Sequence, residues 1–210
     1  TGATGGLGGA LAHELSAAGA ELLLAARDMQ KLGRLRDSLN TRAVIAQADL
    51  NSGDDIAALA RTARDFEVNV LINNAGIGCF GLLEQQPWQD IERTLSTNLL
   101  TPIRLTQAML PWLKAQPQAA IVNIGSAFGS IPFAGFAAYS SAKAGLRGFS
   151  QALRRELADT RVDVIHLAPR AIDTPLNSPA VNALNRALGN RSDTPEAAAK
   201  KIVEILRRGD

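Results

Sequence analysis

Tyr139 and Lys143 are the two residues whose types and spacing most directly suggest chemistry. A separation of four residues places both side chains on one face of a helix, about one turn apart. A free tyrosine titrates near ~10, but a nearby ammonium group favours the phenolate and lowers this pKa toward the range of a general acid or base. The alternative is a half-buried tyrosine beside a surface lysine, although Tyr139 is the only tyrosine of the chain.

Short apolar runs alternate with longer helical patterns along the chain, and these elements must position the pair. Several of the runs are continuously apolar, as in strands that are buried on both faces of a parallel sheet. The runs are Glu21–Ala26, Ala43–Ala48, Asn69–Asn73, Ala120–Gly125 and Val162–Ala168. The helical patterns are Gly9–Ala18, Met29–Leu39, Ser52–Arg64, Trp88–Leu113, Ala138–Leu157 and Pro195–Arg208. The alternation predicts an α/β fold, a single doubly wound (Rossmann-type) parallel sheet with helices on both faces.

In such sheets, ligands bind beyond the carboxyl ends of the strands, so the residues after each run are the first candidates for a site. These residues are Arg27, Asp49, Asn74–Gly76, Ser126 and Pro169. Ser126 ends the run that precedes Tyr139, and its hydroxyl could hold the same substrate oxygen by a hydrogen bond.

A glycine-rich segment, Thr1–Gly9, leads directly into the first helical pattern. Glycines allow a close approach of the backbone to a ligand, and a helix N-terminus attracts a pyrophosphate through its N–H groups and dipole. The spacing of Gly2, Gly6 and Gly8 differs from the common G-x-G-x-x-G fingerprint, so the segment alone could also be a tight turn.

The end of the next run bears on the choice of nucleotide. NAD-binding loops usually place a carboxylate there for the ribose 2′-hydroxyl, but this chain has Ala26 followed by Arg27. An arginine can pair with a 2′-phosphate, so the sequence favours NADP over NAD. Two alternatives stay open: Asp28 could hold the 2′-hydroxyl if the strand ran two residues further, or both charges could belong to a surface loop.

Composition excludes several classes of protein. The 210 residues carry 22 Lys and Arg against 20 Asp and Glu, with no basic block that would suit nucleic acid. No apolar run is long enough to span a bilayer, and the single cysteine, Cys79, agrees with a reducing cytoplasmic location. Two isolated histidines, His13 and His166, do not suggest a metal site. The length suits one domain, residues 1–210.

Motifs along essentially the whole chain resemble those of the short-chain dehydrogenase/reductase family, in its compact subclass. Thr1–Gly8 is similar to the family's cofactor loop T-G-x-x-x-G-x-G, and Asn73–Gly76 to its N-N-A-G motif. The remaining matches, in the family's order, are Asp49–Leu50, Asn98, Ser126 with Tyr139 and Lys143, and Pro169–Thr174.

This resemblance implies a catalytic set of Ser126, Tyr139, Lys143 and Asn98. Tyr139 would exchange a proton with the substrate, Lys143 would lower its pKa and hold the nicotinamide ribose, Ser126 would position the substrate oxygen, and Asn98 would complete a water relay. The implied cofactor contacts are Gly2, Thr4, Gly6, Leu7, Gly8, Arg27, Asp49, Leu50, Asn74, Ala75, Gly76, Tyr139, Lys143, Pro169, Ile172 and Thr174.

Two features depart from the family pattern. Arg170 stands where the family usually has glycine, and we expect it either to contact a cofactor phosphate or an acidic substrate group, or to point to solvent. The strands that the family has at each end are absent from residues 1–210, so we expect terminal strands to be missing. Residues 176–194, with apolar side chains at helical spacing, are expected to form a substrate lid.

The leading hypothesis is an oxidoreductase that transfers a hydride between NADP(H) and a carbonyl or secondary alcohol of a small substrate. The substrate would be hydrophobic or acyl, because Phe80, Ile131, Phe133 and Phe136 would make its pocket apolar. One alternative is a dinucleotide-binding sensor or scaffold without catalysis. Another is a nucleotide-sugar epimerase or dehydratase, for whose longer C-terminal domain the chain has no room. The resemblance also implies a homodimer or homotetramer through the helices near Trp88–Leu113 and Ala138–Leu157.

Overall fold

The five strands among the described residues all pair in parallel, as the continuous apolar runs predict. The computed structural model describes residues 1–208, so residues 209 and 210 of the expected domain lie outside the described part. The strands are β1 (Leu22–Ala26), β2 (Ala43–Gln47), β3 (Val70–Asn73), β4 (Ala119–Ile124) and β5 (Val162–Leu167). Their bounds agree with the predicted runs to within one residue, and the α/β class is confirmed.

Hydrogen bonds join these strands as β1–β2 and as β3–β4–β5. The one sheet expected from the sequence is therefore bonded as two parallel ladders, because no strand within residues 1–208 pairs with both β1 and β3. The chain divides into two compact units, of which the first comprises residues 1–48 with those from Arg170 onward and the second comprises Asp49–Pro169.

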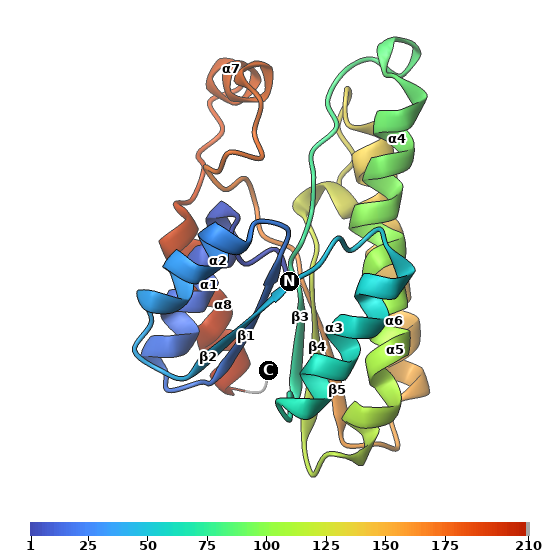
Figure 1. The fold of residues 1–210 in the computed structure, drawn as a ribbon. Helices are drawn as coiled ribbons and strands as arrows, with labels where there is room; N and C mark the ends of the chain where they lie inside the picture. Colours follow the sequence, from blue (N-terminus) through green and yellow to red (C-terminus); the bar gives the residue numbers. More distant parts are fainter. Residues whose placement is uncertain (209–210) are drawn as a thin grey trace. The chain divides into compact units, whose positions relative to one another are not determined.

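Three helices of the first unit pack on the β1–β2 ladder or on one another (Figure 1). They are α1 (Gly6–Ala17), α2 (Met29–Asp37) and α8 (Pro195–Arg208). α2 contacts both strands, whereas α1 lies against α8, so helices from the two ends of the described chain lie side by side (blue and red in Figure 1). Leu24 of β1 and Leu32 of α2 share the buried core of this unit.

In the second unit, α3 (Gly53–Asp65), α5 (Thr101–Ala115) and α6 (Ala137–Glu156) lie on one side of the β3–β4–β5 ladder (Figure 1). β4 is the middle strand, and its residues Ile121 and Val122 are fully buried. A middle strand that is covered throughout explains why the sequence reads there as a continuous apolar run.

Buried polar side chains interrupt this apolar layer and hydrogen-bond one another. Asn73 of β3 donates from Nδ2 to Oδ1 of Asn123 at 2.8 Å and to Oγ1 of Thr106 at 3.2 Å. Asn123 of β4 donates in turn to Oγ of Ser150 on α6 at 2.8 Å. Because each of these side chains has a partner, the network links two strands to α5 and α6 at little cost from desolvation.

The helix that the sequence predicts over Trp88–Leu113 has three segments. α4 (Trp88–Leu95) leads into a π-helical stretch, η2 (Ser96–Leu100), and then into α5. π-Helical turns are rare and occur often at functional sites. Asn98 occupies the middle of this one and is fully buried.

Residues 176–194 contain a short helix, α7 (Pro179–Ala187). The Ser178 hydroxyl caps its first turn by accepting a hydrogen bond from Val181 N at 3.3 Å. The helical spacing seen in the sequence is therefore real, and the lid function stays a prediction. No helix within residues 1–208 is both long and apolar enough to cross a membrane.

Candidate active site

Ser126, Tyr139 and Lys143 all lie in the second unit. Tyr139 sits in the first turn of α6, and Lys143 follows it one turn later on the same helix. Ser126 comes directly after Gly125, the last residue of the predicted strand run. Its Oγ accepts a hydrogen bond from Phe128 N at 3.2 Å. This hydrogen bond caps the short 3-10 helix η3 (Ala127–Gly129). The side chain of Ser126 also hydrogen-bonds that of Tyr139, so the structure brings these two hydroxyl groups together.

Gly129 allows the Ser126 turn to approach α6 closely. A Cβ atom at Gly129 would lie 2.8 Å from the carbonyl oxygen of Lys143 and 2.9 Å from its carbonyl carbon. Any side chain here would therefore push against the backbone of the lysine itself, and only glycine fits. This contact holds the serine turn against the turn of α6 that carries Lys143.

Burial raises the pKa of Tyr139 above its usual value, and the hydrogen bond from Ser126 offsets this only partly. The spacing alone suggested the opposite direction, because it placed an ammonium group beside the phenol. In the structure, Nζ of Lys143 lies 5.9 Å from the centre of the tyrosine ring, and desolvation of the phenol, rather than the ammonium group, sets the direction of the shift. Tyr139 is therefore a protonated phenol at neutral pH, the form that can donate a proton.

Lys143 is only 5% exposed, and its Nζ donates to the carbonyl oxygen of Ile124 at 2.8 Å. Burial lowers the pKa of its ammonium group to about 8. A buried cation beside a neutral backbone partner is costly for stability, and such costs are typical of functional groups.

Asn98 is held on the backbone of Ile77 by two hydrogen bonds. Its Oδ1 accepts from Ile77 N, and its Nδ2 donates to Ile77 O, both at 2.8 Å. A Cβ atom at the neighbouring Gly76 would lie 3.2 Å from Oδ1 of Asn98 and 3.8 Å from Nζ of Lys143. The absence of a side chain at Gly76 thus leaves room for the amide of Asn98, while the relay role of Asn98 stays a prediction.

The other predicted cofactor residues of the second unit follow strands, as expected. Asp49 comes soon after β2, and its Oδ1 accepts from Asn51 N at 3.0 Å, while the carbonyl of the buried Leu50 accepts from Thr101 Oγ1 at 2.8 Å. Asn74, Ala75 and Gly76 follow β3 directly, and Pro169 follows β5 by two residues.

The glycine loop lies in the first unit and starts α1. Gly2 has a φ of 65°, which favours glycine, and its carbonyl accepts from Gly5 N at 3.0 Å. α1 begins at Gly6, with Gly5 at its N-cap and no capping side chain among the described residues. Gly6, Leu7 and Gly8 therefore form a first turn without a side-chain cap, as an anion-binding helix N-terminus requires.

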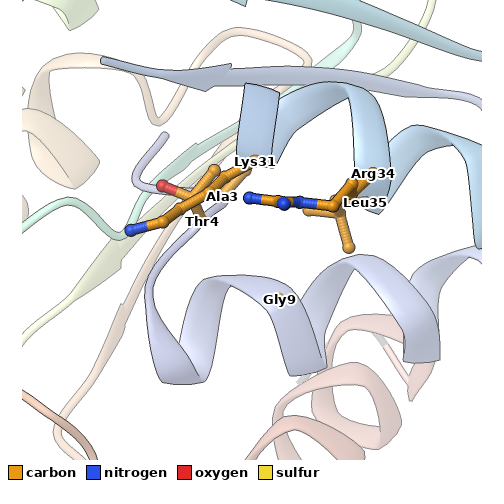
Figure 2. Close-up of a pocket in the computed structure, with 6 residues that line it drawn as sticks. All are labelled: Ala3, Thr4, Gly9, Lys31, Arg34 and Leu35. Atoms are coloured by element: carbon orange, nitrogen blue, oxygen red, sulfur yellow. The ribbon is translucent and has the colours of Figure 1, made fainter. Parts of the chain in front are cut away.

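A hollow of about 180 Å³ lies between this loop and α2, lined by Ala3, Thr4, Gly9, Lys31, Arg34 and Leu35. Figure 2 shows the side chains of Lys31 and Arg34 extending from α2 in the same direction, toward the loop that carries Thr4. Two cations beside a helix N-terminus make this hollow suitable for an anionic group.

The strand before α2 ends at Ala26, so Asp28 lies beyond it. Oδ1 of Asp28 accepts from Lys31 N at 2.9 Å and caps α2, and its Oδ2 lies 3.6 Å from Nζ of Lys31. The carboxylate of Asp28 is therefore occupied in capping α2, whereas Arg27 is exposed directly after the strand.

Arg170 contacts a carboxylate of its own chain. It forms a two-point ion pair with Asp193, which neither of the sequence expectations for Arg170 included. Near it in sequence, Thr174 packs on the glycine loop, because a Cβ atom at Gly6 would lie 2.9 Å from its methyl carbon. Ile172 forms a parallel bridge with Asp193.

Residues 1–185 match the sequence profile of the family described as short chain dehydrogenase. This chain belongs to that family. The match covers the glycine loop and the Ser126, Tyr139 and Lys143 group whose geometry is given above.

Members of the short-chain dehydrogenase family with this degree of similarity include named reductases. The chain is 34% identical over 179 residues to a 3-oxoacyl-[acyl-carrier-protein] reductase of Vibrio cholerae, covering 83% of this chain and 72% of that protein. It is 36% identical over 184 residues to a sulfoacetaldehyde reductase of Chromohalobacter salexigens, covering 83% and 71%. A short-chain dehydrogenase from Sphingobium yanoikuyae in complex with NADPH superposes with a TM-score of 0.88 at 31% identity, covering 99% of this chain and 82% of that one.

The sequence patterns did not predict several residues that contact the candidate site. Gly129 had no distinguishing signal, because its tight contact is with a residue fourteen positions away. Lys31 and Arg34 resembled ordinary surface charges, although their spacing of three does place both on one face of a helix. Ile77 contributes only backbone atoms to the Asn98 contact, so its side-chain type carries no signal.

Proposed function

We propose that this short-chain dehydrogenase uses NADP(H) to interconvert a carbonyl group and a secondary alcohol. The observation that carries the proposal is the half-buried, protonated Tyr139, hydrogen-bonded to Ser126 and placed one turn before the buried Lys143. When bound, NADPH supplies a hydride to the carbonyl carbon. Tyr139 donates its phenolic proton to the carbonyl oxygen as the alcohol forms, and the reverse reaction returns both.

The neighbouring groups support this proton transfer. The Ser126 hydroxyl is close enough to Tyr139 to share the substrate oxygen with it and hold that oxygen in place. The positive charge of Lys143 stabilises the phenolate left behind, and a pKa of about 8 keeps much of this charge at neutral pH. Asn98 keeps the backbone of Ile77 in position beside Gly76.

We propose NADP over NAD because the first unit places positively charged side chains where the ribose of the nucleotide is expected to bind. Ala26 ends the strand, Asp28 is engaged in capping α2, and Lys31 and Arg34 line the hollow beside the glycine loop. Arg27 is exposed next to the strand end. This charge pattern fits a nucleotide with an additional 2′-phosphate, and the NADPH complex of the Sphingobium relative agrees with it.

The remaining cofactor contacts are proposed from the family resemblance, within each unit. In the first unit they are Gly2, Thr4, Gly6, Leu7, Gly8, Ile172 and Thr174. In the second unit they are Asp49, Leu50, Asn74, Ala75, Gly76, Tyr139, Lys143 and Pro169. Residues 176–194 are proposed as the substrate lid.

Tyr139→Phe tests the catalytic assignment. We expect the rate of NADPH oxidation with a reactive carbonyl to fall by about 10²–10⁴-fold, the usual contribution of a general acid. NADPH binding, followed by its fluorescence, is the control and should be retained. An unchanged rate in the variant would refute the role of Tyr139, and a wild-type protein that binds NADPH without turnover of any carbonyl would favour a sensor or scaffold.

Lys31→Glu and Arg34→Glu test the nucleotide preference. Each variant should weaken NADPH binding by roughly tenfold while changing NADH binding less, because only NADPH carries the 2′-phosphate. Arg36→Glu, on the same helix but paired with Asp37 and outside the hollow, is the matched control. Equal losses for both nucleotides, or a wild-type preference for NADH, would contradict the assignment.

An apolar substrate is proposed from the aromatic rings beside Tyr139. The Phe136 ring lies edge-on at 6.1 Å from that of Tyr139 and contacts those of Phe80 and Phe128, both at 4.8 Å. Phe133 stacks on Phe128 at 5.9 Å. A panel of aromatic ketones, aliphatic ketones and 3-ketoacyl thioesters tests this, and activity confined to small charged aldehydes would overturn it.

A further inference from the structure

Arg170 and Asp193 form an ion pair with good two-point geometry. Nε of Arg170 donates to Oδ2 of Asp193 at 2.8 Å, and Nη2 donates to Oδ1. The Asp193 side chain is only 17% exposed, and Nζ of Lys201 lies 3.8 Å from its Oδ2. Most surface ion pairs contribute little, but two parallel hydrogen bonds to a largely covered carboxylate are the favourable case.

Backbone hydrogen bonds join the same two places in the chain. Asp193 N donates to Ala171 O, and Asp173 N donates to Asp193 O, both at 2.9 Å. Ile172 and Asp193 thereby form a parallel bridge. The ion pair and the bridge together fasten the two ends of the segment that contains α7.

The fastened end continues directly to the glycine loop of the same unit. Asn177 Nδ2 donates to Ile172 O at 2.9 Å, and Asn177 N donates to Thr174 O at 3.0 Å, so the short stretch from Ile172 to Asn177 is held together. The methyl group of Thr174 then packs on Gly6, the first residue of α1. A continuous set of contacts therefore leads from Arg170 to the proposed pyrophosphate-binding turn.

We propose that Arg170 and Asp193 are positioning residues for the cofactor: their ion pair holds Ile172–Thr174 against the glycine loop. This inference rests on the proposed function. Neither residue needs to touch the nucleotide. The ion pair restricts the stretch in advance, so that less conformational freedom is lost when NADPH binds. Glycine at position 170 would lack this restraint.

Asp193→Asn and Arg170→Ala test the inference by NADPH titration. Asparagine retains the size of the side chain and the backbone bridge but removes the charge. We expect the Kd for NADPH to rise roughly three- to tenfold in each variant, as expected for loss of a well-formed two-point ion pair. The double variant Arg170→Asp with Asp193→Arg restores the pair in reverse and should recover most of the affinity.

Glu21→Gln is the matched control, because it removes an exposed ion pair with Arg42 in the same unit. Trypsin cleavage after Arg186 and Arg191 supplies a readout without nucleotide, and both sites should be cut faster in Asp193→Asn.

Three results would be decisive. Faster cleavage with an unchanged Kd would show that the ion pair holds the segment but not the cofactor, which overturns the inference. An unchanged Kd together with unchanged cleavage would overturn it as well. A wild-type protein that binds neither NADPH nor NADH would instead overturn the proposed function.

Discussion

Lys143, a proposed catalytic residue, lies in an environment that is unfavourable for the stability of its charged form. The ammonium group is removed from water and donates to the neutral Ile124 carbonyl, so burial brings its pKa from 10.5 to about 8. That shift corresponds to roughly 3 kcal/mol of destabilisation by the charged form. Residues with such costs concentrate where function requires them.

Lys143→Met should therefore stabilise the protein while it abolishes turnover. We expect the free energy of unfolding at pH 7 to rise by about 2 kcal/mol, because the charge is removed and the lost hydrogen bond offsets about 1 kcal/mol. Urea denaturation without nucleotide measures this, and lower stability of the variant at pH 7 would contradict it.

The pH dependence of this difference has a definite sign. Since the folded pKa of Lys143 lies below the unfolded value, the unfolded chain binds more protons between about pH 8 and 10.5. Wild-type stability relative to Lys143→Met should therefore rise across this window, and the gap should close as the lysine becomes neutral. If the difference in unfolding free energy between wild type and Lys143→Met is constant from about pH 7 to 10, burial of the charge is not its cause.

At the scale of elements, close backbone packing joins the Ser126 turn to α6. Gly129→Ala would place a Cβ atom 2.8 Å from Lys143 O, which the backbone of the helix can relieve only by moving. We expect kcat to fall by about tenfold or more, as small misplacements of reacting groups cost heavily. Steady-state kinetics measures this.

Gly148→Ala is the matched control for that substitution. Gly148 lies on α6, and a Cβ atom there would have no described neighbour within 4 Å, so alanine should retain activity and stabilise the helix by about 0.5–1 kcal/mol. Equal kinetics for the two alanine variants would exclude a positioning role for Gly129.

The buried network of Asn73, Asn123 and Ser150 makes a second prediction at this scale. Ser150→Ala leaves Nδ2 of Asn123 without its partner among buried residues, at a cost of about 1–3 kcal/mol. Ser141→Ala removes a comparable hydroxyl, bonded to Ala137 O on the same helix but exposed, and should change stability by less than about 0.5 kcal/mol. Thermal denaturation that ranks the two variants equally would contradict the importance of the network.

At the scale of the whole molecule, the prediction of a homo-oligomer concerns the helical run from α4 to α5 and the helix α6. Trp88 is 67% exposed at the start of α4, and Leu100 is 48% exposed at the end of η2. Large exposed apolar side chains on this run suit an interface between copies of the chain.

Light scattering at micromolar concentration should therefore give the mass of a dimer or tetramer. Trp88→Glu should lower this mass, because a carboxylate would be buried without a partner at the interface. Glu84→Gln, just before the run, is a control that should leave the mass unchanged. A monomeric wild-type protein would refute the prediction.

The sequence by itself determined the elements and the identity of the chemical groups. Strand bounds, the helix that carries Tyr139 and Lys143, and the glycine loop before α1 follow from periodicity and spacing, which are local properties of the chain. The family motifs added the order in which these elements occur.

Tertiary structure alone decided the environments of those groups. The raised pKa of Tyr139, the pairing of Arg170 with Asp193, and the contact of Gly129 with Lys143 depend on segments that are separated along the chain. Desolvation and close contact arise only when such segments pack together, and local residue patterns do not encode which partners will meet. For this reason the sequence predicted candidate residues for the chemistry, while the structure determined their protonation and what holds them in place.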